Sequence, residues 1–324
     1  MSTRLHLRTP AKINLDLRVL HKRPDNFHEL RTVFQTISLA DTLEIEYRPS
    51  PRTHLELDDP LAIPDNLVLR AARSVLDALK LHAQIRFRLN KKIPMGAGLG
   101  GGSSNAAAVL LALPALARRP LQPDLLLNLA SDLGSDVPFF LTGGTALALG
   151  RGTELYPLPD TAQDPMLLVA PGIHVSTPAA YQALGLSLTS PDASRKMNGF
   201  QLFVRTLCDL RSARAASTLS ANDFESAVFS QHPQLKKMWS RLRKHAAGAR
   251  MTGSGSALFA LFESSAERDL AEKVLEGDPV MKGCRVMPAR LVSGASYRRM
   301  WRRQLAEAGL PDDLLWPLPS RHAR

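Results

Sequence analysis

The chain has 324 residues, of which 44% are hydrophobic, and a formal net charge of +11. This length favours two domains of similar size and argues against a disordered chain, while the lack of a signal segment or of eighteen consecutive apolar residues predicts a soluble, cytoplasmic protein. The positive charge suits nucleic acid, an anionic membrane or a phosphate-rich small molecule, and charge alone does not choose among them.

The first half of the chain mixes strand and helix patterns. Apolar and polar residues alternate, as in half-buried strands, at residues 5–7, 11–20, 43–47, 54–57 and 85–89. In the second of these strands, one face would carry Lys12, Asn14, Asp16 and Arg18. Residues 66–79 have helical spacing, and Asp65 or Asn66 can cap that helix.

The second half shows a similar mixture after a break. Prolines and polar residues between 157 and 165 indicate a linker, so we place a domain boundary at residue 158. The pattern then predicts strands at 166–170 and 284–287, helices at 217–229, 234–247 and 266–275, and a Gly/Ser turn between 251 and 257. Helices interleaved with antiparallel strands favour an α+β fold.

These patterns divide the chain into three parts. Residues 1–158 and 159–297 form two predicted domains. Residues 298–324 form a basic tail, whose sequence indicates a solvated amphipathic helix and to which we assign no role.

The most informative segment is a glycine-dense loop that passes directly into an Ala/Leu helix. Its glycines are Gly96, Gly98, Gly100, Gly101 and Gly102. Glycine lets the backbone approach a ligand closely, and the free N–H groups of a helix start attract anions, so the segment predicts a phosphate site. Ser103 and Ser104 can cap the helix, and a hydroxyl there can also reach a phosphate-bound magnesium ion.

Two other phosphate-binding motifs fit this loop less well. The P-loop ends in Gly-Lys-Ser/Thr, whereas Gly102 is followed by Ser-Ser-Asn. The dinucleotide pattern G-x-G-x-x-G is matched literally, but it requires a second strand and an acidic residue about twenty positions on. The sequence instead continues with Arg118-Arg-Pro120 and a helical run at 124–133, so no βαβ unit follows.

Together with segments 10–15 and 250–256, the loop resembles the three ordered motifs of the GHMP kinase superfamily. Segments 23–30, 133–138 and 170–178 also follow the order and spacing of its 4-diphosphocytidyl-2-C-methyl-D-erythritol kinase family, and the resemblance covers residues 8 to 295. It implies two α+β domains, an N-terminal half like ribosomal protein S5 domain 2 and a ferredoxin-like C-terminal half, with the active site between them.

The resemblance also implies a reaction and its cofactors. ATP, with Mg²⁺, would phosphorylate the 2-hydroxyl of a cytidine-diphosphate-linked methylerythritol in the non-mevalonate isoprenoid pathway. The phosphate loop would comprise Pro94, Met95, Gly96, Ala97, Gly98, Leu99, Gly100, Gly101, Gly102, Ser103, Ser104 and Asn105. Asn66, Leu67 and Lys91 would lie near the adenine, and Ser103 or Ser104 would reach the magnesium ion.

In the same resemblance Asp136 is the catalytic base and Lys12 is its charged partner. From the residues alone, Asp136 is equally an N-cap of the short apolar segment that follows it, and Lys12 is a solvated lysine at a strand end. Asp132, four residues before Asp136, is the nearest alternative carboxylate.

The substrate side is expected to hold the cytosine between aromatic residues. An aromatic residue beside a histidine in a loop suits stacking on a base, although such residues more often anchor a loop. The residues implied are Asn14, Phe27, His28, Thr177, Pro178 and Tyr181. The family commonly has tyrosine at the position of Phe27, so a hydroxyl contact is missing here while the stacking face remains.

Two alternatives stay open at this point. A nucleic-acid-binding protein would account for the charge and for Tyr297-Arg-Arg-Met-Trp-Arg-Arg303, but no strand alternates basic and aromatic residues. A sister kinase acting on mevalonate or homoserine would share the glycine-rich loop but not the Asn-Phe-His-Glu-Leu segment at 26–30. We therefore expect a small-molecule substrate, no nucleic acid or membrane partner, and a monomer or homodimer.

Overall fold

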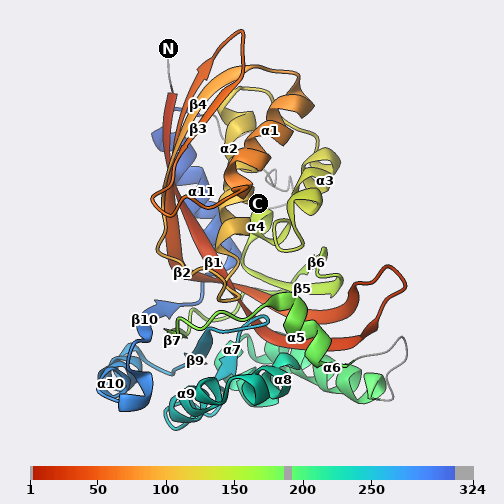
Figure 1. Ribbon diagram of the computed structural model, residues 1–324, viewed down its shortest axis with the longest axis vertical. Coiled ribbons are helices and arrows are strands. Elements are labelled where there is room, and N and C mark those ends of the chain that lie inside the picture. Colours follow the sequence, from red (N-terminus) through yellow and green to blue (C-terminus); the bar gives the residue numbers. More distant parts are fainter. Residues whose placement is uncertain (1–2, 186–191, 311–324) are drawn as a thin grey trace.

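The computed structural model describes residues 3–185 and 192–310 and has two layered halves, one above the other in Figure 1. The upper half contains a sheet with the strand order β3-β4-β2-β5-β6, to which β1 is added by pairing with β2. Its elements are β1 (Thr3–Lys22), β2 (His28–Pro49), β3 (His54–Asp58), α1 (Leu67–Leu79), β4 (Ala83–Asn90), α2 (Gly101–Leu116), α3 (Pro123–Leu133), α4 (Phe139–Thr142), β5 (Thr145–Gly150) and β6 (Glu154–Pro157).

The lower half contains a four-stranded antiparallel sheet with the order β10-β7-β9-β8. Its elements are β7 (Pro165–Ala170), α5 (Thr177–Ala183), α6 (Ala193–Leu210), α7 (Ala213–Ala216), η1 (Ser217–Leu219), α8 (Phe224–Gln231), α9 (Pro233–Arg243), β8 (Arg250–Met251), β9 (Leu258–Leu261), α10 (Ser265–Glu276), η2 (Pro279–Met281) and β10 (Arg285–Arg290). A last helix, α11 (Gly294–Glu307), returns to the upper half (Figure 1). These two mixed halves confirm the predicted α+β, two-domain fold class.

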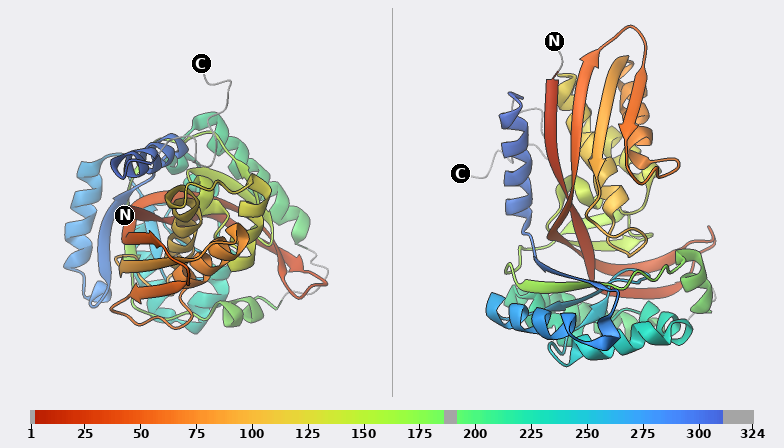
Figure 2. Two further views of the ribbon diagram at one scale, coloured as in Figure 1. Left: turned by 90° about the horizontal axis from the view of Figure 1, so that it is seen from above. Right: turned by 60° about the vertical axis from the view of Figure 1, so that its left-hand side comes forward.

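Strand β1 joins the two halves. It runs antiparallel to β2 from the top of the upper sheet down into a hairpin that lies over the lower half (Figure 2). Its pairing with β2 shifts register near Lys12, Asn14 and Val19, and such bulges redirect side chains. The prediction of a half-buried strand is wrong for the stretch from Thr9 to Leu17, which is buried on both faces because the lower half covers its second face.

The core of the upper half is built around α2. Nearly all of this helix is buried, and its alanines let it approach the sheet and α1 closely. The predicted helix at 66–79 is confirmed as α1, and the side chain of its cap, Asn66, accepts a hydrogen bond from Val68 N. A further apolar cluster, which includes Ile13, Ala97 and Phe259, fills the space between the halves.

Two predictions about helices are wrong. Ser103 and Ser104 do not cap α2, because Gly100 adopts a left-handed conformation (φ 67°) and starts the helix before them. The helix predicted at 217–229 is broken into η1 and α8, because Ala221 and Asp223 hydrogen-bond with the main chain of Leu17 instead.

The basic tail was also misjudged. The predicted boundary at residue 298 falls inside α11, which packs on β1 and α4 and buries Tyr297, Trp301 and Leu305 in the core of the upper half. Figure 2 shows α11 lying along β1, the edge strand of the sheet. The expectation of a solvated helix without a role is therefore wrong for this part of the tail, and residues 311–324 lie outside the described residues.

Candidate active site

The glycine-rich loop meets the Gly/Ser turn of the lower half. Gly98 has a φ of 77°, and a Cβ atom at this position would lie 2.5 Å from the carbonyl oxygen of Thr252. Ala257 N also donates a hydrogen bond to Ala97 O. Two of the sequence motifs are thus in direct contact, and only glycine fits at this crossing.

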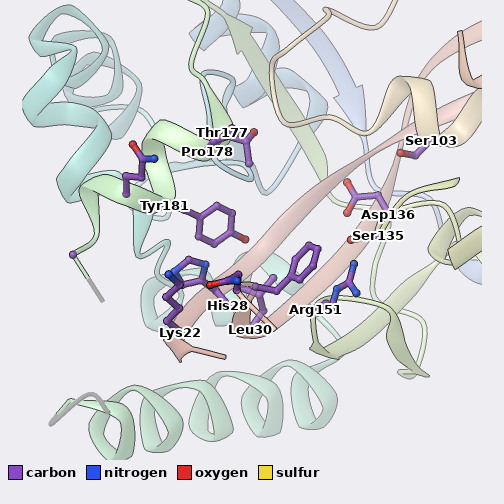
Figure 3. Close-up of a pocket in the computed structure, with 14 residues that line it drawn as sticks. Lys22, His28, Leu30, Ser103, Ser135, Asp136, Arg151, Thr177, Pro178 and Tyr181 are labelled. Carbon is purple, nitrogen blue, oxygen red and sulfur yellow. The ribbon is translucent and has the colours of Figure 1, made fainter. Parts of the chain in front are cut away.

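The first turn of α2 offers its main-chain N–H groups without a capping side chain. Of the two serines, Ser104 is buried and donates to the carbonyl oxygen of Pro10. Ser103 instead lines the cleft beside Asp136 (Figure 3). Asn105 is buried, and its amide bonds Thr9 and Asp41 inside the protein. Ser103 is therefore the hydroxyl available to a phosphate or to its metal ion.

Two of the three residues expected near adenine, Leu67 and Lys91, lie at the start of α2, whereas the side chain of Asn66 caps α1 and bonds Asp59. A Cβ atom on Gly101 would lie 3.0 Å from Lys91 Nζ, and one on Gly102 would lie 3.7 Å from Leu67 Cδ1. The ammonium group of Lys91 pairs with the buried carboxylate of Asp41. Lys91 is thus held in place by an internal ion pair, next to the main-chain anion site.

Within the loop itself, the apolar side chains divide by exposure. Ala97 and Leu99 are buried in the cluster between the halves, and Met95 is 58% exposed. Pro94 is partly buried. The buried side chains anchor the loop, which leaves its main chain as the part that faces a ligand.

Lys12 and Asp136 form an ion pair at the centre of the site. Lys12 Nζ lies 3.3 Å from Asp136 Oδ2 and donates to Asn14 Oδ1 at 2.8 Å. The lysine side chain is only 4% exposed, whereas the carboxylate is 32% exposed. Lys12 is therefore not a solvated strand-end lysine, and its partner reaches the cleft.

The alternative roles for the acidic residues are not supported. The N-cap of α4 is Pro138, without a side-chain capping bond, so Asp136 is not a helix cap. Asp132 is exposed on α3 and does not line the cleft. Of the two carboxylates, only Asp136 faces both the glycine-rich loop and the cavity.

Two adjoining cavities extend from this ion pair. The smaller, of about 180 Å³, lies among Lys12, Asn14, Gly98, Asp136 and the Gly253-Ser254 turn. The larger, of about 730 Å³, continues towards His28, Thr177, Pro178 and Tyr181. Figure 3 shows Asp136 and Ser103 at one end of the larger cavity and His28 and Tyr181 at the other. The cleft therefore connects the glycine-rich loop with an aromatic end.

The aromatic end is partly prearranged. The rings of His28 and Tyr181 are stacked with their centroids 4.5 Å apart, so no base can enter between them. Phe27 is 47% exposed in the hairpin turn and carries the guanidinium of Arg151 at 3.5 Å from its ring centroid. A base can therefore use Phe27 and Tyr181 as separate walls but not the gap between Tyr181 and His28.

Two pKa shifts describe the environment of this end. Burial, helped by the positive charge of Lys22, lowers the pKa of His28, so its ring is neutral at neutral pH. Burial, with the negative charge of Asp136 as a smaller cause, raises the pKa of Tyr181 to about 12. Both groups therefore act as neutral hydrogen-bonding side chains.

Several residues that line the cleft were not predicted to be site residues from the sequence. They are Lys22, Asn26, Ser135, Arg151, Gln182, Gly253 and Ser254. Arg151 had one detectable signal, since it is a cation between two glycines at the end of the apolar segment 145–149. The others come from separate turns that only the fold brings together.

Among the described residues, no group of three His, Cys, Asp or Glu side chains could hold a metal ion by itself. Within the same residues, we find no helix with the length and apolar character needed to cross a bilayer.

Comparisons with known proteins agree with this geometry. The family descriptions "GHMP kinases N terminal domain" and "GHMP kinases C terminal" match residues 66–144 and 204–277. A 4-diphosphocytidyl-2-C-methyl-D-erythritol kinase from Solibacter usitatus is 51% identical over 98% of this chain and 97% of its own length. A crystal structure of a 4-(cytidine 5'-diphospho)-2C-methyl-D-erythritol kinase superposes with a TM-score of 0.72 at 36% identity, covering 89% of this chain and 99% of that one.

A homoserine kinase structure from Cytophaga hutchinsonii shares the fold alone. Its TM-score is 0.67 at 19% identity, over 90% of this chain and 96% of its own.

Proposed function

The chain belongs to the 4-diphosphocytidyl-2-C-methyl-D-erythritol kinases of the GHMP kinase family, and from this we propose that it transfers the γ-phosphate of ATP to the 2-hydroxyl of 4-diphosphocytidyl-2-C-methyl-D-erythritol. The reaction belongs to the non-mevalonate isoprenoid pathway. The observation that carries the proposal is the ion pair of Lys12 and Asp136, which lies where the glycine-rich loop opens into the cleft.

In this proposal Asp136 accepts the proton of the attacking hydroxyl. A carboxylate that orients the hydroxyl and accepts its proton is the usual protein contribution to such a transfer. The partial exposure of Asp136 lets a substrate reach it, and the ion pair with the buried ammonium group of Lys12 holds the carboxylate in place. Lys12 also places positive charge beside the oxygens that gain negative charge in the transition state.

The phosphates of ATP would be bound by main-chain N–H groups of the loop and of the first turn of α2. The serine hydroxyl that faces this point is Ser103. Adenine would lie on the side of Asn66, Leu67 and Lys91, of which Leu67 and Lys91 lie beside the start of α2. No carboxylate cluster is needed for Mg²⁺, because this ion commonly keeps several waters and binds through nucleotide phosphates with one or two protein oxygens. When bound, Mg²⁺ would neutralise charge on the phosphates, and Ser103, which lines the cavity, would offer its hydroxyl oxygen to the ion.

The cytidine end would occupy the larger cavity. Phe27 and Tyr181 offer ring faces, and the neutral ring of His28 offers a hydrogen-bonding edge. Thr177 and Pro178 line the same wall. Lys22 and Arg151 supply positive charge along the cavity, where a diphosphate would pass.

The test is ATP-dependent turnover of 4-diphosphocytidyl-2-C-methyl-D-erythritol, with mevalonate and homoserine as competing acceptors and with Mg²⁺ present or removed by chelation. We expect phosphorylation of the cytidine compound alone, and only with Mg²⁺. Consumption of mevalonate or homoserine without turnover of the cytidine compound would refute the assignment. Localisation in the cytoplasm, the lack of a nucleic-acid partner and the oligomeric state stay predictions.

A further inference from the structure

The segment between η1 and α8 pairs with β1, the strand that carries Lys12 and Asn14. Leu17 N donates to Ala221 O at 2.8 Å, and Asp223 N donates to Leu17 O at 3.0 Å. The side chain of Asp223 also accepts a hydrogen bond from Val19 N. The segment is therefore an added stretch of extended chain along β1, in contact with the strand that carries Lys12 of the proposed catalytic ion pair.

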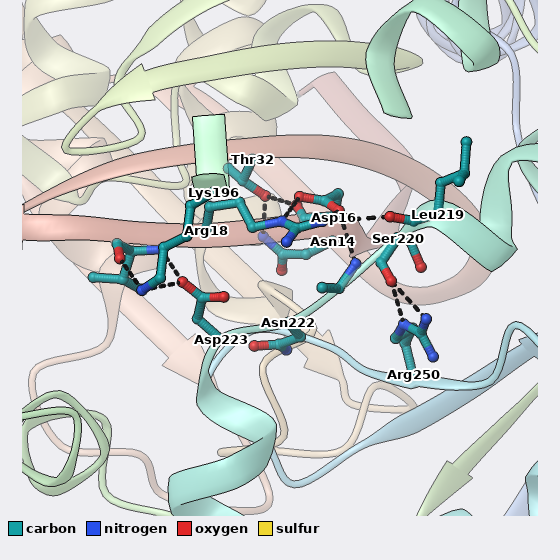
Figure 4. Close-up of polar contacts among 12 residues, drawn as sticks. Asn14, Asp16, Arg18, Thr32, Lys196, Leu219, Ser220, Asn222, Asp223 and Arg250 are labelled. Carbon is teal, nitrogen blue, oxygen red and sulfur yellow. Dashed lines mark hydrogen bonds and ion pairs between the residues drawn. The ribbon is translucent and has the colours of Figure 1, made fainter. Parts of the chain in front are cut away.

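Charged side chains fix both ends of this pairing (Figure 4). Asp16 is fully buried, accepts two hydrogen bonds from Arg18 at 2.8 and 2.9 Å, and accepts a third from Ala221 N. Lys196 of α6 pairs with Asp223 at 2.8 Å. Because each buried charge here has a partner, the segment is held rigidly rather than loosely packed.

Asn222, at the middle of the segment, bonds only to main chain. Its Nδ2 donates to Met251 O at 2.7 Å and to Gly253 O at 2.8 Å, and its Oδ1 accepts from Phe224 N. The residue is 6% exposed. The two carbonyl groups that it binds lie on either side of Thr252, at the start of the Gly/Ser turn.

That turn is part of the active-site wall. Asn14 N donates to Thr252 Oγ1 at 2.9 Å, and Ser254 and Thr177 share a hydrogen bond of 2.9 Å between their hydroxyls. Gly253 and Ser254 line the smaller cavity together with Lys12 and Asp136. A displacement of the turn would therefore change the distance between the glycine-rich loop and the ion pair.

We propose that Asn222 is a positioning residue of the phosphoryl transfer, whose amide fixes the Gly/Ser turn against the glycine-rich loop. It touches neither the cavity nor the reacting groups and acts through Met251 and Gly253. This inference rests on the proposed function. It assigns a catalytic consequence to a side chain for which the sequence patterns gave no signal.

The test is Asn222→Asp, which keeps the shape and the acceptor for Phe224 N but replaces the two donors by an oxygen that faces two carbonyl oxygens. We expect kcat to fall by about 10- to 10²-fold, the effect of a small misplacement of reacting groups. KM for the cytidine substrate should change by a smaller factor than kcat, because the turn meets the substrate wall through the Ser254–Thr177 hydrogen bond but contacts the glycine-rich loop directly.

Two variants separate positioning from general effects. Asn198→Asp introduces the same charge at an exposed position of α6 and should change neither kcat nor stability. Leu275→Ala removes a buried side chain of α10 in the same half, so it should lower the melting temperature while kcat at 25 °C stays near that of the parent.

A kcat for Asn222→Asp within about threefold of the parent, or an equal loss of kcat in Leu275→Ala, would overturn the inference. If Asn222→Asp does not fold, Asn222→Ser, which is too short to reach both carbonyl groups, is measured in the same way and judged by the same limits. If the parent itself does not phosphorylate the cytidine compound, the proposed function fails separately. Binding of ATP by the parent and by the folded variant then decides, and equal affinities would overturn the role of Asn222.

Discussion

Replacing Asp136 by asparagine removes the negative charge from the centre of the site and leaves the side-chain shape nearly unchanged. The variant keeps an acceptor that can orient the substrate hydroxyl but cannot take up its proton. General-base catalysis contributes about 10²- to 10⁴-fold, so we expect kcat to fall by that factor. KM for ATP and for the cytidine substrate should change little, because neither the loop main chain nor the aromatic end is altered.

The same substitution has a calculable effect on stability. Two unit charges 3.3 Å apart attract each other by about 5 kcal/mol at an effective dielectric constant of about 20. Because Asp136 is about one-third exposed and the burial of Lys12 opposes this attraction, we expect a loss of about 1–2 kcal/mol. For a chain of this size that corresponds to a fall of about 1.5–3 °C in melting temperature. The hydrogen bond from Lys12 to Asn14 remains and limits the loss.

The assay measures ADP release at saturating concentrations of both substrates, together with thermal unfolding, for Asp136→Asn and for Asp132→Asn. The control removes an equal charge from an exposed site on α3, four residues earlier in the chain, and should leave both quantities unchanged. A kcat for Asp136→Asn within about threefold of the parent would remove Asp136 from the mechanism.

Three further outcomes are expected. Phe27→Ala should raise KM for the cytidine substrate about tenfold and leave KM for ATP unchanged, since base stacking contributes about 1–3 kcal/mol; an equal change for both substrates would make the ring a loop anchor. Trp301→Ala should lower the free energy of unfolding by about 3–5 kcal/mol, measured by thermal unfolding, with little change in kcat at 25 °C. Substitution of the exposed neighbour, Arg302→Ala, should alter neither quantity. An unchanged melting temperature for the tryptophan variant would contradict the packing of α11. Because burial and Lys22 lower the pKa of His28, its neutral form persists below the ordinary histidine pKa. KM for the cytidine substrate should therefore be constant from about pH 8 to 6.5 and rise only at lower pH. A rise already at about pH 7 would show that the ring takes up its proton at a higher pH than expected.

Local signals in the sequence predicted the elements that have them. Asn66 followed by apolar residues at helical spacing predicted α1 because a cap and a periodic face are both local properties. The start of α2 was predicted too late, because serine at a helix start usually caps, whereas here the left-handed conformation of Gly100 starts the helix earlier. The break before α8 depends on pairing with Leu17, about two hundred residues away, which no local pattern contains.

The burial of one face of α11 could have been predicted from the sequence. Tyr297, Trp301 and Leu305 recur every four residues, which is the spacing of a buried helical face. The arginines between them, however, favoured the interpretation of a solvated basic helix. What the sequence could not supply was the partner of that face. The helix starts near the lower half and runs along the edge strand of the upper half. Its buried face therefore packs against residues from the opposite end of the chain.

The candidate site shows the same division between local and distant information. The glycine-rich loop is a single segment, so its chemistry follows from its own residues. The proposed catalytic pair is different, because Lys12 and Asp136 are separated by more than a hundred residues and become a pair only when β1 and the turn after α3 meet. Strand β1 brings the parts together, since Lys12 bonds the glycine-rich loop, Asn14 bonds the Gly/Ser turn and Asp16 bonds the segment before α8. One strand thus sets the distance between the glycine-rich loop and the Gly/Ser turn. Asn222 is bound to that turn and lies in a segment paired with that strand. For this reason its buried amide should influence kcat without touching either substrate.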